Sequence, residues 1–330
     1  MSPRGPNALG EFALIERYFV RPSRDPAVRL PIGDDAAVVM PAPGHELVLS
    51  VDMLVEGRHF LPDVDPESLG HKVLAVNLSD LAAMGATPRW ALLAGALPDA
   101  DERWLEGFTR GWFALADRFG VSLVGGDTTR GPRNLCVTIL GEVPAGAAIT
   151  RAGAHAGDDV WVSGTLGDAM LALAALQGRT VLSEEALATL RVRLERPEPR
   201  VALGEALRGI ATAALDVSDG LTGDLAHILD ASHVGARIGI ASLPRSDAMA
   251  AKLAAERSLA LACLLAGGDD YELCFTAAAA DRARVQQAGL ACGVQVARIG
   301  VVTREAGLEI VDESGAPLPA LPRAFDHFTT

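Results

Sequence analysis

Apolar residues recur along the chain at the two spacings that distinguish helices from strands. Apolar positions three to four residues apart predict helices in the first half of the chain over residues 11–19, 65–85 and 101–120. Short apolar runs bounded by turn-forming residues predict strands over residues 36–40, 46–54, 90–98, 121–127 and 134–144. The run 46–54 alternates less cleanly than a strand with one wet face, so we expect both of its faces to be covered.

Two of these helices carry additional signals. Asp65 is a favourable N-cap residue for the second helix, Pro66 suits its first turn, and Gly85 can end it. The third helix has aromatic residues along one stripe, and we expect Trp104 and Trp112 on that stripe to be core residues.

The pattern of elements starts again near residue 146. A strand is predicted over 157–164, followed by helices over 165–178, 184–195 and 201–210. We expect the charged stretch 184–200 to be a solvated helical face.

This restart predicts a second domain. Residues 151–159 are rich in Gly and Ala and have no periodicity, which is typical of a connection, so the boundary falls near 145–155. We therefore divide the chain into domains 1–148 and 149–330. Strands and helices mix in both, which predicts an α/β or α+β fold for each.

Charge and cysteine content restrict the partners and the location. The chain has 42 acidic and 29 basic residues, a net charge of −13, whereas duplex nucleic acids and anionic membranes bind clusters of Lys and Arg. We therefore expect neither as a partner. The N-terminus lacks the apolar core of a signal peptide, and the four cysteines form no C-x-x-C pair. These features predict a cytoplasmic protein with reduced thiols.

Several aspartates interrupt segments that are otherwise apolar. Asp52 lies within the strand 46–54. Asp80 follows Asn77 by three residues, so Asn77 and Asp80 project from one face of the helix 65–85. The adjacent Asp34 and Asp35 repel each other, so a positive partner is expected nearby. Similar acids occur later in the chain at Asp127, Asp216 and Asp219. Taken singly, each is more often an N-cap or turn residue; taken together, they suggest a site.

Carboxylates that converge with few bases beside them need a cation. Oxygen ligands without His or Cys favour Mg²⁺ or Ca²⁺ over zinc, and Mg²⁺ commonly bridges carboxylates to substrate phosphates. The segment 125–131, "GGDTTRG", suits this role, because glycines let the backbone approach a phosphate and Asp127 can hold the metal. The chain has no Walker A sequence and no protein-kinase motifs.

Seven motifs, in order and over nearly the full length, resemble the thiamine-monophosphate kinase family. They are "PIGDDAAVV", "SVDMLVEGRHF", "HKVLAVNLSDLAAMGATP", "GGDTTRG", "DVSDGL", "GGDDYELCF" and the closing "FDHF". The wider superfamily, which includes aminoimidazole ribonucleotide synthetase, shares "NLSDLAAMGA", "GGDTTRG" and "DVSDGL". In contrast, "EGRHF", "GGDDYELCF" and "DHF" are particular to this kinase family.

The resemblance implies a fold and an activity. The fold would be the two-domain aminoimidazole ribonucleotide synthetase-like fold. Its N-terminal sheet domain would bind ATP and Mg²⁺ and form the dimer interface, and its C-terminal α/β domain would close over nucleotide and substrate. The activity would be direct transfer of the γ-phosphoryl group of ATP to thiamine monophosphate, giving thiamine diphosphate. A homodimer, several Mg²⁺ ions and no covalent nucleophile are expected.

The resemblance also implies the residues of the site. The expected Mg²⁺ ligands are Asp35, Ser50, Val51 through its backbone, Asp52, Asp80, Asp127, Asp216 and Asp219. The expected ATP contacts are Gly126, Asp127, Arg151 and Ser218. The expected substrate contacts are His59, Asp269 and Pro322. Asp35 would face the metal, and Asp34 would serve the turn.

Two positions depart from the family pattern. Asp269 stands where relatives commonly have Glu, and Pro322 stands where an aromatic residue usually stacks on the substrate; Phe325 could compensate. Three alternatives remain open. His59 could be a solvated loop residue, and the protein could be another ATP-using enzyme of the superfamily or a non-catalytic Mg-nucleotide-binding protein.

Overall fold

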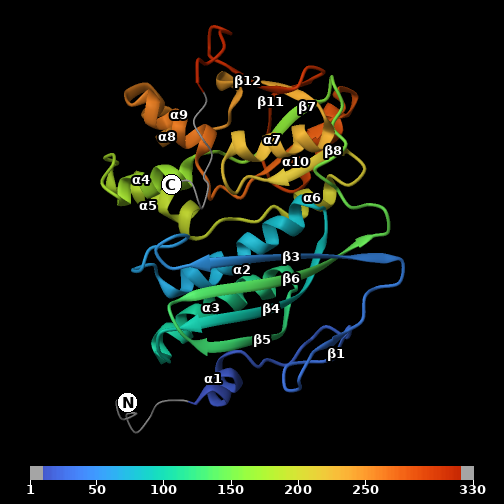
Figure 1. Ribbon diagram of the computed structural model, residues 1–330, viewed down its shortest axis with the longest axis vertical. Helices are drawn as coiled ribbons and strands as arrows, with labels where there is room; N and C mark the ends of the chain where they lie inside the picture. Colours follow the sequence, from blue (N-terminus) through green and yellow to red (C-terminus); the bar gives the residue numbers. More distant parts are fainter. Residues whose placement is uncertain (1–9, 321–330) are drawn as a thin grey trace. The chain divides into compact units, whose positions relative to one another are not determined.

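The computed structural model describes residues 10–320, which form two compact units (Figure 1). The first unit comprises the chain up to Leu81 together with Thr87–Ala145. The second comprises Ala82–Ala86 and the chain from Gly146 onward. Within residues 10–320, no helix has both the length and the apolar character needed to cross a membrane.

The first unit is built on a four-stranded sheet with two long helices, α2 (Pro66–Ala83) and α3 (Glu102–Phe119), on one of its faces (Figure 1). The strands, in spatial order, are β3 (His45–Val55), β6 (Asn134–Pro144), β4 (Thr87–Leu97) and β5 (Ser122–Arg130). Only β4 and β5 pair in parallel, and α3 is the crossover between them. The remaining elements are α1 (Glu11–Tyr18), β1 (Val28–Leu30) and β2 (Val38–Val39).

The local signals that predicted the two long helices act as expected. The Asp65 carboxylate accepts the Ser68 N–H at 2.9 Å before α2, and Asp101 caps α3. The two helices pack closely, because a Cβ atom at Gly70 would overlap the Phe108 carbonyl oxygen. Trp112 is 1% exposed in this core.

One expectation about the first unit is wrong. The strand β3 was expected to be covered on both faces, yet Leu47, Leu49, Val51 and Met53 are 41–60% exposed, because the long helices α2 and α3 lie on the other face (Figure 1). The helix predicted over 11–19 is confirmed as α1, whose buried residues are Leu14 and Tyr18, while Phe12 is 84% exposed.

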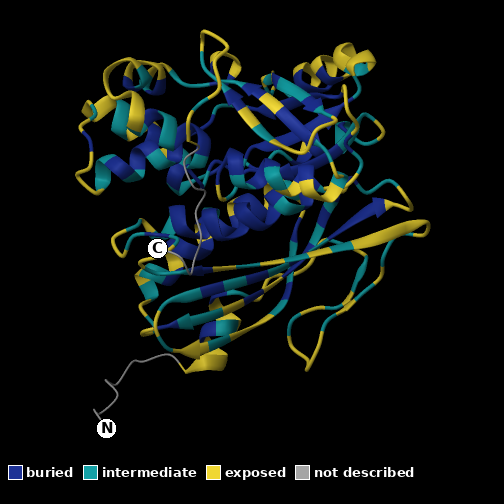
Figure 2. Cartoon of the chain, turned by 45° about the horizontal axis from the view of Figure 1, so that its top comes forward, coloured by how far each residue is buried: buried dark blue, intermediate teal, exposed yellow. Residues whose placement is uncertain are grey.

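The second unit is built on a six-stranded, mostly antiparallel sheet. Its strands, in spatial order, are β12 (Gly307–Val311), β9 (Gly235–Gly239), β11 (Val296–Thr303), β7 (Asp159–Ser163), β10 (Leu273–Ala277) and β8 (Ala211–Asp216). Only β12 and β9 pair in parallel. The strands β7 and β10 are neighbouring interior strands of this sheet and are buried along their whole length; Figure 2 colours the chain by burial.

The helices of the second unit surround this sheet. They are α4 (Asp168–Leu176), α5 (Glu184–Glu195), α6 (Val201–Ala206), α7 (Leu221–Ser232), α8 (Asp247–Ala255), α9 (Arg257–Ala266) and α10 (Arg282–Ala291), with the short 3-10 turns η1 (Ile240–Ser242) and η2 (Ala279–Asp281). The expectation that 184–200 is a solvated face is wrong in part. Arg193 and Arg200 point inward and pair with Glu272, which is fully buried.

Candidate active site

The structure brings together the predicted metal ligands of β3 and α2. The Ser50 hydroxyl donates to the Asp80 carboxylate, and the backbone N–H of Asp52 donates to the Asn77 side-chain oxygen at 3.1 Å. Asn77 is held in turn, because its amide donates to the Val73 carbonyl at 2.9 Å. Ser50, Asp52 and Asp80 are half-buried. We call Asp52 and Asp80 the β3–α2 acids. Together with the Ser50 hydroxyl they offer oxygen atoms of the kind that hard divalent cations prefer.

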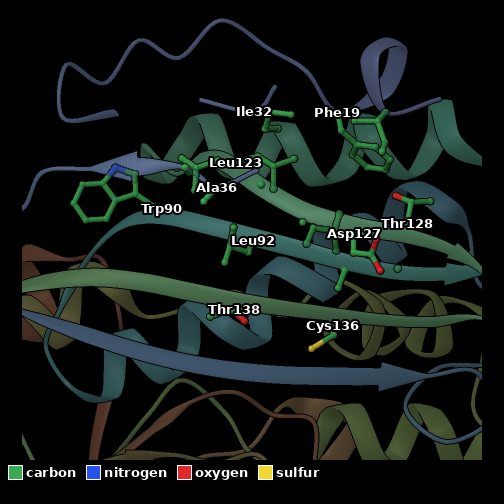
Figure 3. Close-up of a pocket in the computed structure, with 18 of the residues that line it drawn as sticks. Phe19, Ile32, Ala36, Trp90, Leu92, Leu123, Asp127, Thr128, Cys136 and Thr138 are labelled. Carbon is green, nitrogen blue, oxygen red and sulfur yellow. The ribbon is translucent and has the colours of Figure 1, made fainter. Parts of the chain in front are cut away.

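A second group of predicted residues lines a cavity of about 1000 Å³ in the first unit (Figure 3). Asp35, Gly126 and Asp127 contribute to it, together with Phe12 and Phe19 of α1. Figure 3 shows Asp127 and Thr128 at one end of the cavity and Trp90 at the other. The Asp34 carboxylate accepts the Asp35 N–H at 2.8 Å, as a residue that serves the turn would.

The sheet register separates these two groups within one chain. Asp127 pairs with Ala94, in the row that continues to Cys136 and Met53 on the open face. Ser50 and Asp52 alternate with the exposed residues of β3 and face α2. The strands β3 and β5 are the two edges of the sheet, with β6 and β4 between them. Three strand spacings amount to about 14 Å, so one ion cannot contact Asp52 and Asp127 of the same sheet.

His59 lies in a tight loop that follows β3. The backbone N–H of Val55 donates to His59 Nδ1 at 3.0 Å, so the neutral ring carries its proton on Nε2. The His59 carbonyl accepts from the Lys72 ammonium group at 3.2 Å, and Lys72 is only 2% exposed. The His59 ring is therefore oriented by a hydrogen bond from its own loop, whereas the ring of a solvated loop histidine would have no fixed orientation.

In the second unit, the predicted residues of "DVSDGL" lie in the turn between β8 and α7. Asp216 is 7% exposed, Ser218 is half-buried and Asp219 is exposed. Sequence reasoning missed Asp224, which lies in the first turn of α7 and accepts the backbone N–H groups of this turn. Burial raises the pKa of the Asp224 carboxyl to about 7, and the N–H donors oppose that rise.

The predicted substrate contact Asp269 lies beside that turn. Its N–H donates to the Ser218 carbonyl at 2.9 Å, and the Tyr271 N–H donates to the Val217 carbonyl at 2.8 Å. Asp269 and Tyr271 both have positive φ, 68° and 49°, a conformation that costs a non-glycine residue about 1 kcal/mol or more. The backbone of "GGDDYEL" is thus fixed directly to the backbone of "DVSDGL".

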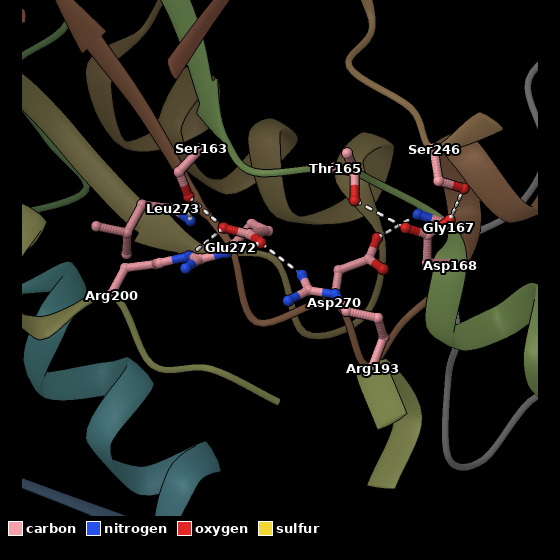
Figure 4. Close-up of polar contacts among 10 residues, drawn as sticks. All are labelled: Ser163, Thr165, Gly167, Asp168, Arg193, Arg200, Ser246, Asp270, Glu272 and Leu273. Carbon is pink, nitrogen blue, oxygen red and sulfur yellow. Dashed lines mark hydrogen bonds and ion pairs between the residues drawn. The ribbon is translucent and has the colours of Figure 1, made fainter. Parts of the chain in front are cut away.

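Two buried carboxyls, those of Asp270 and Glu272, fix the "GGDDYEL" segment to neighbouring segments of the second unit (Figure 4). Glu272 accepts from Arg193 at 2.6 Å, from Arg200 at 2.5 Å and from the Ser163 hydroxyl at 2.6 Å. Asp270 accepts the Gly167 N–H at 2.7 Å. Burial raises the pKa of the Asp270 carboxyl well above its usual range. The approach of Arg193 and Arg200 to Glu272 was not predicted, because the charge of the stretch 184–200 indicated a solvated face.

The remaining predicted site residues are Arg151, Pro322 and Val51. Arg151 is exposed, and its carbonyl accepts from Ser232 at 3.3 Å. Pro322 and Phe325 lie outside the described residues. Within residues 10–320, no three His, Cys, Asp or Glu side chains form a ready-made metal centre. Val51 presents an apolar side chain on the open face, so only its backbone could serve as a ligand.

Two family descriptions match this chain. "AIR synthase related protein, N-terminal domain" matches residues 33–143, and "AIR synthase related protein, C-terminal domain" matches residues 155–313. The fold and these matches define a two-domain protein of the AIR synthase related class.

Curated and solved relatives narrow the class. The chain is 47% identical over 327 residues to the thiamine-monophosphate kinase of Salmonella typhimurium, which covers 98% of this chain and 99% of the relative. The crystal structure of thiamine-monophosphate kinase from Stenotrophomonas maltophilia superposes with a TM-score of 0.85 at 47% identity, over 92% of this chain and 97% of that one. The structure described as "AaThiL complexed with AMPPCP and TMP" superposes with a TM-score of 0.76 at 31% identity, over 90% of this chain and 92% of that one. The chain belongs to the thiamine-monophosphate kinase family.

Proposed function

We propose that this protein phosphorylates thiamine monophosphate to thiamine diphosphate, with ATP as the phosphoryl donor. The observation that carries the proposal is the 47% identity to a thiamine-monophosphate kinase over 98% of the chain. A related structure is described as a complex with AMPPCP and TMP, an ATP analogue together with the substrate. The main alternative, another ATP-using enzyme of the superfamily, has no comparable support at this identity.

The transfer would proceed directly between the two phosphates. The γ-phosphoryl group is attacked by a phosphate oxygen of thiamine monophosphate, the bond to the β-phosphate oxygen breaks, and ADP leaves. No side chain needs to form a covalent intermediate, because catalysis of this type works by positioning and charge stabilisation. We propose that Gly126, Asp127, Arg151 and Ser218 contact ATP. His59 and Asp269 would contact thiamine monophosphate, with Pro322 at the place of the usual aromatic.

We propose that Mg²⁺ ions complete the site. The donor set fits, because the β3–α2 acids offer only oxygen atoms, and the chain carries a net charge of −13 that would otherwise repel a triphosphate. Asp35, Asp52, Asp80, Asp127, Asp216 and Asp219 would hold the ions, with the Ser50 hydroxyl and the Val51 carbonyl. Bound Mg²⁺ would neutralise charge on the phosphates during the transfer.

We propose further that the protein is a homodimer formed through the open face of the first sheet. The apolar residues of β3 on that face are 41–60% exposed, and monomeric proteins rarely leave so continuous an apolar row in water. The separation of Asp52 from Asp127 is a second argument, because a partner sheet could bring the opposite edges together. Leu49→Asp should yield monomers in light scattering, whereas Val192→Asp, at an exposed position of α5, should not.

The remaining proposals concern the domains and the location. Residues 1–148 would form the ATP- and Mg-binding, dimerising domain, and residues 149–330 the domain that closes over nucleotide and substrate. All four cysteines are free, which supports a location in the reducing cytoplasm.

The decisive experiment measures ADP and thiamine diphosphate together. Purified protein is incubated with Mg·ATP, with and without thiamine monophosphate, and with free thiamine as a control. The proposal requires ADP and thiamine diphosphate in equal amounts only when thiamine monophosphate is present. ATP consumption that ignores thiamine monophosphate would favour another enzyme of the superfamily. Nucleotide binding without turnover would favour a non-catalytic protein.

A further inference from the structure

A single carboxylate oxygen organises the turn that carries Ser218 and Asp219. The backbone N–H groups of Ser218, Asp219 and Gly220 all donate to Asp224 Oδ2, each at 3.0 Å. Asp224 is 5% exposed and lies one turn into α7. A carboxylate that reaches back from the first turn of a helix to the preceding N–H groups resembles a capping box, here with three donors. The N–H groups of the turn that precedes α7 are therefore satisfied from within the chain.

This arrangement changes how the turn can meet a phosphate. Successive N–H groups at the start of a helix usually form a cradle for an anion. Here the Asp224 carboxylate already accepts the three N–H groups of the turn that leads into α7. Any contact between this turn and a nucleotide must come from the side chains of Ser218 and Asp219, or through a metal ion.

The turn is also fixed on its other sides. The Val217 N–H donates to the Glu272 carbonyl at 2.7 Å, and the Ser218 carbonyl accepts from Asp269. Gly220 has φ of 117°, and a Cβ atom there would lie 2.6 Å from the Ala266 carbonyl carbon, at the end of α9. The segment is thus held by residues 269–272 on one side and by the end of α9 on another, and Asp224 is the contact that fixes its N–H groups.

We propose that Asp224 is a positioning residue of the nucleotide site, one that holds the Ser218–Gly220 turn in its binding conformation before the nucleotide arrives. The inference rests on the proposed function, because it takes Ser218 and Asp219 as contacts of ATP and its metal. A preformed turn does not have to be ordered on binding, and the avoided entropy cost appears as affinity.

The first test compares Asp224→Asn with Asp230→Asn. Asparagine keeps the volume and one oxygen of Asp224, but a neutral acceptor binds the three N–H groups more weakly than a carboxylate does. Asp230 is an exposed acid of the same helix without contact to the turn, so its substitution removes the same charge. Affinity for Mg·AMPPCP is measured by calorimetry, and KM and kcat are measured for both substrates.

We expect Asp224→Asn to weaken Mg·AMPPCP binding roughly tenfold, about 1.4 kcal/mol, and to raise KM for ATP more than it lowers kcat. Asp230→Asn should behave as the wild type. If Asp224→Asn only lowers Tm and binds Mg·AMPPCP normally, Asp224 is a structural cap and the inference is wrong.

The second test uses the wild-type protein and does not depend on the variant folding. Amide hydrogen exchange at residues 218–220 is measured with and without Mg·AMPPCP. We expect these amides to be protected already in the free protein, with little further change. Protection gained only with the nucleotide would overturn the inference. A wild-type protein that binds Mg·AMPPCP without phosphorylating thiamine monophosphate would instead refute the proposed function, and both tests of Asp224 would still apply.

Discussion

Two acids of the first unit and three of the second differ in their burial and in their partners. In the first unit, Asp80 and Asp127 are half-buried or exposed and lie beside other oxygen atoms or on a cavity. In the second, Asp224, Asp270 and Glu272 are almost completely buried, and their partners are N–H groups, guanidinium groups and a hydroxyl. Acids of the first kind have electron pairs to offer a ligand, whereas those of the second kind already hold the chain. For these five acids, exposure and partner chemistry, rather than residue type, distinguish the proposed ligand-binding acids from the positioning acids.

The strongest test of the comparison is Asp80→Ala. Because Asp80 is half-buried on α2 and faces the Ser50 hydroxyl, we expect the variant to fold and to lose kinase activity by at least about 1000-fold, roughly 4 kcal/mol. Asp117→Ala on α3 is the matched control, since that acid forms only an exposed ion pair. Full activity combined with a lower Tm would make Asp80 a structural residue and remove it from the proposed metal ligands.

Glu272→Gln tests the opposite kind of acid. The substitution leaves Arg193 and Arg200 without their buried counter-charge, so we expect the free energy of unfolding to fall by about 3 kcal/mol in denaturant titrations. Glu195→Gln, which loses a more exposed pair with Arg191, should cost less than about 1 kcal/mol. An unchanged unfolding free energy with lost activity would place Glu272 among the ligand-binding acids and break the comparison.

The metal dependence of nucleotide binding sharpens the role of the first unit's acids. We expect Mg·ATP to raise Tm much more than ATP with EDTA, because a chain of net charge −13 attracts a triphosphate poorly without a cation. At about 100 times its dissociation constant, a ligand stabilises the folded state by roughly 2.7 kcal/mol. Differential scanning fluorimetry measures the shifts. Equal shifts with and without metal would contradict the proposed role of Mg²⁺.

His59 gives the smallest expected effect and the most selective one. The Val55 N–H donates to His59 Nδ1, so His59→Asn can keep an acceptor for the loop while it removes the distal ring nitrogen. We expect KM for thiamine monophosphate to rise roughly tenfold, about 1.4 kcal/mol, and KM for ATP to stay nearly constant.

His59→Ala is the companion variant. It removes the loop acceptor as well, so it should share the change in KM and also lose stability. Unchanged kinetics in both variants would mean that His59 orders its loop without contacting the substrate. A lower kcat with both KM values unchanged would place His59 at the transferring phosphoryl group.

Local patterns predicted most of the elements. Asp65 and Pro66 begin α2, as the capping signals predicted. The pairing of Ser50 with Asp80 could be anticipated in part, because Asp80 and Asn77 share one face of a helix. The role of Asp224 could not, because an acid in the first turn of a helix is common and its three donors are visible only in the folded turn.

The sequence by itself determined which chemical groups this protein has and which residues of each element share a face, because helical and strand periodicity depend only on local geometry. It could not determine what covers each face, because that depends on elements far apart in the chain. Only the tertiary structure left the apolar residues at the odd-numbered positions 47–53 of β3 exposed. It also turned Arg193 and Arg200 inward to Glu272. It also separated Asp52 from Asp127, because the strand order β3–β6–β4–β5 places them at opposite edges of one sheet.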